Sequence, residues 1–122
     1  MKSLPAPVRV LLLALVIAPS LAQQERRVAV TDLKPLLKQA IVEGHAYGVL
    51  TGEAAAYVRE RFDASTPIHI DVMRLHALPR PGCHRLEITT RQQGVLEGSK
   101  RTEKELTYQL SYCLDGSFPG KG

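Results

Sequence analysis

The spacing of apolar residues along the chain changes near Pro67, from a helical period to the two-residue period of strands. Upstream of this point, apolar side chains recur three and four positions apart between Asp32 and Gly44, which is typical of an amphipathic helix. Asp32 is a residue typical of a helix N-cap, and Gly44 of a helix end. A second helix is predicted to begin at Thr51 as its N-cap and to run to about Phe62.

Downstream of Pro67, apolar and polar residues alternate in three segments, which predicts three β-strands. The first segment has two apolar sets whose parity switches near Val72 and Met73. We therefore expect either a β-bulge there or a strand partly buried on both faces. The predicted strands are residues 68–78, 83–93 and 103–113, with a turn at 79–82, a glycine-punctuated loop at 93–101 and a loose tail at 114–122.

These elements predict an α+β domain in which two N-terminal helices pack on a three-stranded antiparallel β-meander with one disulfide. Residues 23–30 are interpreted as a short polar lead-in. Because the helices precede the strands in a block and do not alternate with them, the pattern argues against a parallel sheet. No internal repeat divides the chain, so we expect a single small domain over residues 23–122.

The first 22 residues have the three-part organisation of a cleaved secretory signal peptide. Lys2 and Arg9 make the start basic, an uncharged apolar run follows, and Pro19 then precedes small residues at Ser20 and Ala22. The apolar run is shorter than the roughly 20 residues that span a bilayer, which makes an uncleaved membrane anchor the weaker alternative. We predict cleavage after Ala22, no transmembrane segment afterwards, and a mature protein in the periplasm or secreted.

Composition favours a small aliphatic core and argues against nucleic-acid binding. The chain has no tryptophan, two phenylalanines and four tyrosines. Its formal net charge is +4, and removal of Lys2 and Arg9 with the signal leaves +2, with acidic and basic residues interspersed. Nucleic-acid binding usually requires clustered cations and aromatic residues for stacking. A domain of this size buries little surface, so a covalent crosslink would contribute strongly to its stability.

The two cysteines, Cys83 and Cys113, predict a disulfide and with it a strand register. If they lie directly opposite each other, the hairpin between them centres on Gly98. An exported protein can form this bond, and the long separation of the cysteines in sequence indicates a structural role and not a redox role. The register brings apolar positions together on one face: Leu86 with Leu110, Ile88 with Tyr108, Thr90 with Leu106, and His84 with Tyr112.

The histidines are weak candidates for chemistry. None of the four has the short spacing to another histidine that metal sites usually show, and only His76 and His84, near the predicted first turn of the sheet, are weak metal candidates. His69 and Asp71 share a strand face, where the carboxylate could orient the imidazole as a base. No nucleophile motif accompanies that pair. We predict no catalytic residue, no metal and no cofactor.

Basic residues spread over the predicted sheet form a candidate interaction surface. Their partner would be anionic: peptidoglycan, lipid headgroups or an acidic protein surface. The alternative interpretation is that these cations only prevent edge-to-edge pairing of strands. The residues are Arg74, Arg80, Arg85 and Arg91.

The patterns together favour an exported, non-enzymatic binding or assembly accessory protein of the cell envelope, with secretion and conjugation systems among the assemblies it would serve. Its partner would be another envelope protein, bound at a free edge of the sheet. A second hypothesis is a small ligand- or metal-binding domain or minor hydrolase that uses His69, Asp71, His76 and His84. A third is an inhibitor of a secreted enzyme that inserts the loop at residues 93–101.

Overall fold

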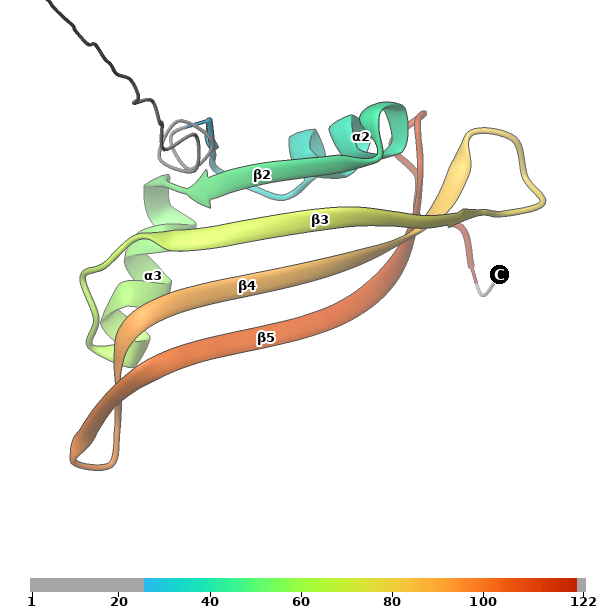
Figure 1. Ribbon diagram of the computed structural model, residues 1–122. Helices are drawn as coiled ribbons and strands as arrows, with labels where there is room; N and C mark the ends of the chain where they lie inside the picture. The colour runs from blue at the N-terminus through green and yellow to red at the C-terminus, as the bar shows by residue number, and fades with distance from the viewer. Residues whose placement is uncertain (1–25, 121–122) are drawn as a thin grey trace, which may run out of the picture.

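The computed structural model describes residues 26–120, so the predicted signal peptide at residues 1–22 lies outside the described part of the chain. In this part, five strands form one mixed sheet in the order β1-β2-β3-β4-β5, and both helices lie on the same side of it (Figure 1). The strands are β1 (Val28–Val30), β2 (His45–Leu50), β3 (Ile68–Ala77), β4 (Cys83–Glu97) and β5 (Lys100–Cys113), and the helices are α2 (Lys34–Glu43) and α3 (Gly52–Phe62).

The predicted fold class is wrong in the size of the sheet and in the order of its elements. The sheet has five strands where three were expected, and the helices alternate with the first three strands. α2 connects β1 to β2, which are parallel, and α3 connects β2 to β3, which are antiparallel. The antiparallel strands β3, β4 and β5 are therefore only part of a larger sheet.

The two strands that the sequence pattern missed are short or have small residues at their buried positions. β1 has three residues, of which only Val30 is buried. In β2 the buried positions are Ala46 and Gly48, which lack the bulk that usually marks a buried strand. A Cβ atom on Gly48 would lie 2.7 Å from Leu36 Cδ1 and 3.0 Å from the carbonyl oxygen of Val28. α2 can therefore lie this close to the sheet only because residue 48 is a glycine. The same glycine leaves β2 without the bulky apolar residue that would have indicated a strand in the sequence.

α2 forms where the helical period predicts it. Asp32 Oδ1 accepts a hydrogen bond from the backbone N–H of Lys34 at 2.8 Å, and Pro35 lies in the first turn, where no intrahelical N–H bond is lost. Gly44 ends the helix in the left-handed conformation, with a φ of 97°. The side chains that α2 buries against the sheet are Leu36, Leu37, Ala40 and Ile41.

β3 has its irregularity closer to the following turn than predicted. The pairing of β3 with β4 shifts between Arg74 and His76, not at Val72 and Met73. Met73 is 41 % exposed, and Leu75 is 42 % exposed. The apparent change of parity in the sequence therefore came from apolar residues at exposed positions of the strand.

The register predicted from the cysteines is confirmed in the β4–β5 hairpin. Cys83 and Cys113 are paired across the two strands and joined by a disulfide. Both cysteines are buried, on the face opposite Leu86. The other predicted pairs are also present: His84 with Tyr112, Leu86 with Leu110, Ile88 with Tyr108, and Thr90 with Leu106.

The loop predicted at residues 93–101 is wrong, because both strands continue into it. β4 extends to Glu97, and β5 begins at Lys100. A register shift between Gln92 and Val95 accommodates an additional residue in β4. Gly94 and Gly98 have positive φ values of 67° and 65°. These two glycines, which the sequence pattern placed in a loop, thus belong to a β-bulge and a tight turn.

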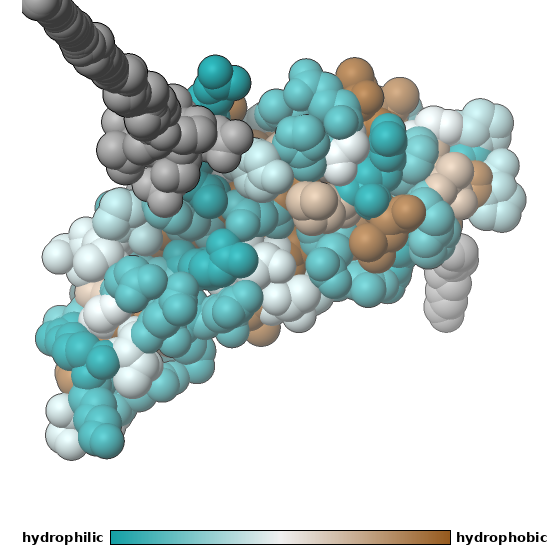
Figure 2. All heavy atoms as spheres, viewed as in Figure 1, coloured by the Kyte–Doolittle hydropathy of each residue, from teal (hydrophilic) through white to brown (hydrophobic). Residues whose placement is uncertain are grey.

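The sheet has an inner face, which carries the helices, and an outer face, which carries none in the described part. The outer face is mostly hydrophilic, with scattered apolar side chains (Figure 2). The core lies on the inner face, between α2 and the sheet. Its buried residues are Val30, Leu36, Leu37, Ala40, Ile41, Ala46, Ile70, Val72, Leu86, Ile88 and Tyr112.

Candidate functional site

A groove of about 740 Å³ lies on the inner face, between the two helices and the strand at the edge of the sheet. Its walls are mostly apolar: α3 contributes Val58 and Phe62, and β5 contributes Leu106, Tyr108 and Leu110. Burial raises the pKa of the Tyr108 hydroxyl above its ordinary value. The volume of this groove and the residues that line it are typical of pockets that bind an apolar ligand or the apolar side chains of a partner.

The helical wall of the groove is open because α3 buries little of its surface. Ala55 is the only buried residue of this helix, and Val58 and Phe62 are half-buried. Arg101 ties the C-terminal end of α3 to the β4–β5 hairpin, since it donates hydrogen bonds to the carbonyl and carboxylate oxygens of Asp63 and to the carbonyl oxygen of Gly94. These contacts connect the C-terminal end of α3 to the hairpin at an exposed position of the surface.

β5 is an edge strand, with no strand beside it on the side away from β4 within residues 26–120 (Figure 1). Hydrogen-bonded and non-hydrogen-bonded pairs alternate along an antiparallel ladder. The Leu114 N–H donates to the Gly82 carbonyl at 2.9 Å, whereas the Cys113 N–H points away from β4 and donates to the Ser117 carbonyl at 3.0 Å. Because this direction alternates along the strand, the backbone N–H and C=O groups of Gln109, Thr107 and Glu105 also point to the side of β5 away from β4.

Charge divides this edge into two parts. Between Lys100 and Glu105 nearly every side chain of β5 is charged, which is a common protection against unwanted strand pairing. Residues 106–110 carry no charge, and Leu106 is 57 % exposed. An unpaired, uncharged edge bordered by an apolar groove is a template for strand addition.

Comparisons with known proteins do not assign the chain: no family model, no curated protein and no solved structure matches it. Neither of the helices in residues 26–120 is long and apolar enough to cross a membrane. The candidate function therefore depends on the geometry of this chain alone.

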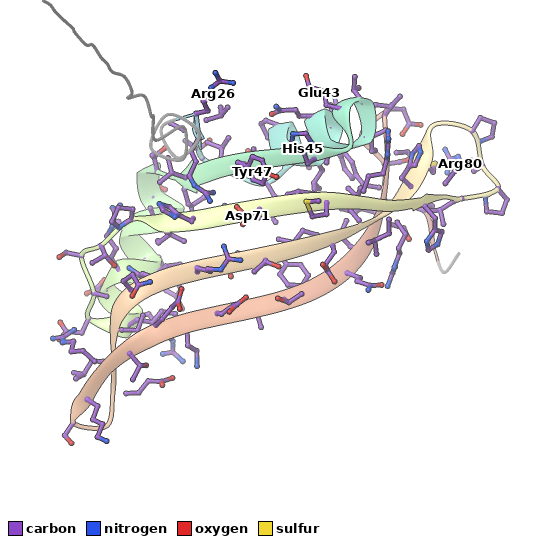
Figure 3. All side chains as sticks on the ribbon, in the orientation of Figure 1. Arg26, Glu43, His45, Tyr47, Asp71 and Arg80 are labelled. Carbon is purple, nitrogen blue, oxygen red and sulfur yellow. A yellow bond between two sulfur atoms is a disulfide. The ribbon has the colours of Figure 1, made fainter. Side chains whose placement is uncertain are left out.

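An ionic cluster on the outer face ties the N-terminal segment to the sheet. Asp71 Oδ1 accepts a hydrogen bond from Arg27 Nη1 at 2.8 Å, and its Oδ2 accepts one from Arg91 Nη1 at 2.9 Å. The Arg27 guanidinium also lies 5.8 Å from the centre of the Tyr47 ring, and Arg91 reaches Glu105 at 3.6 Å. Figure 3 shows Tyr47 and Asp71 on the same face of neighbouring strands. Arg27 was missed in the sequence because it precedes a strand that was itself missed.

His69 lies on this face beside the cluster. Partial burial lowers its pKa from the ordinary value of 6.5, and Arg27 lowers it further, whereas Asp71 acts in the opposite direction. Asp71 directs both carboxylate oxygens to arginines. The geometry therefore favours a structural role for Asp71 over the orientation of a catalytic imidazole.

The lowered pKa of His69 predicts a pH dependence of stability. The folded protein takes up a proton at His69 less readily than the unfolded chain, so the His69 contribution to stability is complete above about pH 6.5 and falls as the pH drops through that value. Urea unfolding at about pH 7.5 and about pH 5.5 measures this loss. His69→Gln should reduce it, and the matched change His76→Gln, at an exposed position of the same strand, should leave it in place. An equal pH dependence in His69→Gln and the unchanged protein would refute this assignment.

The four arginines proposed as an interaction surface are dispersed over separate structural contacts. Arg74 Nη1 donates to the Ile41 carbonyl at the end of α2 at 2.7 Å. Arg80 lies in the β3–β4 turn (Figure 3). It pairs with Asp115 at 3.4 Å. Arg85 bonds to Gln109 and Ser111 of β5, and Arg91 belongs to the cluster around Asp71. The structure does not bring these guanidinium groups together into one patch.

The histidines proposed as weak metal candidates lie near the β3–β4 turn. His76 pairs with Arg85, and His84 pairs with both Ala77 and Tyr112 in the sheet. Cys83, which precedes His84, is held in the disulfide. Among residues 26–120, no group of three or more histidine, cysteine or acidic side chains has the arrangement of a metal site.

Proposed function

We propose that this chain is an exported, non-enzymatic binding protein that docks on another envelope protein by accepting an extended segment of it at the free edge of β5. The observation that carries the proposal is the uncharged part of that edge, residues 106–110, which is bordered on its inner side by the apolar groove. Strand addition is a recurrent mode of recognition in which backbone hydrogen bonds provide affinity and adjacent pockets provide specificity. Such a role fits an accessory or assembly protein of the envelope, with secretion and conjugation systems as candidate assemblies.

Photo-crosslinking from Gln109 tests this docking mode. Gln109 is exposed on β5, and a strand added to the edge would lie about 4.7–4.9 Å from β5. A photoreactive phenylalanine analogue at Gln109 should therefore give a crosslinked product of discrete mass when producing cells are irradiated. The same analogue at Lys38, on the exposed side of α2, should not give that product.

The variant Thr107→Pro tests whether the partner docks by strand addition at β5. Proline at this position removes a backbone N–H that points to the free side and leaves the hydrogen bonds to β4 in place. It should abolish the crosslink from Gln109 while the protein stays folded by circular dichroism. Thr107→Val is the matched control, because it replaces only the hydroxyl group, which bonds to Thr89 Oγ1 at 3.1 Å, with a methyl group and keeps the backbone N–H. A crosslink that persists in folded Thr107→Pro, or that is lost equally in Thr107→Val, contradicts strand addition.

A further inference from the structure

We propose that the outer face of the sheet holds a binding site for a soft monovalent cation of the Cu(I) or Ag(I) class, with the imidazole of His45 and the thioether of Met73 as its ligands. This metal-binding function is independent of the docking edge on β5 and goes beyond the function proposed above. The sequence pattern did not indicate the site, because the pairing of these two residues depends on β2, which the pattern missed.

Strand register brings the two ligands together. His45 of β2 is directly opposite Met73 of β3, and both side chains lie on the outer face. The Arg74 N–H donates to the Gly44 carbonyl at 2.9 Å. The next pair along this antiparallel ladder is therefore a non-hydrogen-bonded one, whose side chains lie closer together. The Cβ atoms of His45 and Met73 are expected about 4.5–5.5 Å apart, a separation that a single metal ion can bridge.

Both ligands are accessible from solvent. His45 is exposed, and Met73 is 41 % exposed. The His45 ring packs beside Tyr47, with the ring centres 5.1 Å apart, on the face that is turned toward the viewer in Figure 3. This neighbour restricts the positions of the imidazole without covering the methionine. A metal ion can therefore reach the pair without any side chain leaving the core.

A carboxylate on the other side of Met73 favours a cation. Glu87 of β4 is directly opposite Met73 on the outer face, and no ion pair within residues 26–120 involves it. Arg85 precedes it by two residues on the same strand and donates hydrogen bonds to Gln109 and Ser111, toward the edge of the sheet. Glu87 can therefore offset the charge of the bound ion and complete its coordination.

The available donor atoms select a soft metal ion. Both cysteines are held in the disulfide, so no thiolate competes for the ion. Met1 and Met73 are the only methionines, and Met1 leaves with the predicted signal peptide. Thioether sulfur is a soft ligand that favours Cu(I), and imidazole also binds copper. Such ions are stable with few ligands, down to a linear pair, so the site does not require a larger group of histidine, cysteine and acidic side chains.

Titration of the oxidised mature protein with Ag(I) tests the site. Ag(I) needs no reductant, so the disulfide stays intact, and a chloride-free buffer keeps the ion in solution. Because Met73 is the only methionine of the predicted mature chain, labelling the methionine methyl group with carbon-13 gives a single NMR signal. This signal and those of the His45 imidazole should shift and reach a plateau at one equivalent of Ag(I). An unshifted Met73 methyl signal overturns the proposal.

Three substitutions separate the paired site from binding by isolated side chains. Met73→Leu and His45→Gln each remove one ligand at an exposed position, and each should weaken Ag(I) binding by at least about tenfold in isothermal titration. His76→Gln, at an exposed position of β3 outside the pair, should leave the affinity unchanged. Unchanged affinity in Met73→Leu, or an equal loss in His76→Gln, contradicts the proposal. Zn(II) binding that is as tight as that of Ag(I) and persists in Met73→Leu would exclude the thioether as a ligand and also overturn it.

Discussion

Replacing Cys83 and Cys113 together by alanine should lower the free energy of unfolding by about 3–4 kcal/mol. The bond closes a loop with a sequence separation of 30 residues, and the chain-entropy model gives a loss of that size for the reduced chain. Small domains have a total stability of only about 5–15 kcal/mol. The disulfide therefore accounts for a large share of the stability of this domain, and formation of the bond in an oxidising compartment would be a requirement for stable folding.

Urea unfolding of the oxidised protein and of the double variant measures this loss. Dithiothreitol should destabilise the unchanged protein and leave the double variant unaffected, which separates loss of the bond from loss of side-chain packing. Equal unfolding midpoints for the oxidised protein, the reduced protein and the double variant would contradict the account.

Gly48→Ala should destabilise the domain by about 1–3 kcal/mol, the usual effect of overpacking a core. The added methyl group would lie 2.7 Å from Leu36 Cδ1 and 3.0 Å from the Val28 carbonyl oxygen. Leu36 is fully buried, which leaves its side chain little space to move into, and the Val28 oxygen is a backbone atom of the neighbouring strand β1. Relief of the contact would thus disturb the parallel part of the sheet.

Thermal unfolding of Gly48→Ala, compared with Gly120→Ala, tests this packing. A Cβ atom on Gly120 would have no neighbour within 4 Å, so that substitution should change the melting temperature little. If both variants melted at the same temperature, the close approach of α2 to β2 would be refuted.

The sequence predicted the elements that carry strong local signals. α2 has a clear apolar stripe and a terminating Gly44, and the β4–β5 register follows from Cys83 and Cys113 together with the alternation of apolar pairs. β1 and β2 escaped prediction because their buried positions are few or small, as at Ala46 and Gly48. Without these two strands, the helices appeared to precede the sheet and not to alternate with its strands.

The candidate site was predicted only in part. A free sheet edge was expected, but the pattern did not identify which strand provides it, because strand order depends on β1 and β2. The groove joins Val58 of α3 to Leu106 of β5, and no local pattern relates two residues so far apart in sequence. The four arginines were predicted as a basic set spread over the sheet. Their side-chain partners, such as Asp71 and Asp115, could not be predicted because tertiary packing decides them.

Backbone hydrogen exchange along β5 tests the docking edge most directly. In the free protein the amides of Leu106, Tyr108 and Leu110, which face β4, should be protected, whereas those of Thr107 and Gln109 should exchange rapidly. Addition of a blocked peptide of about eight residues, a common strand length, in which leucine and threonine alternate should slow exchange at Thr107 and Gln109 and leave their neighbours unchanged. Unaltered exchange at Thr107 and Gln109 with saturating peptide would contradict the central claim that this edge accepts a strand.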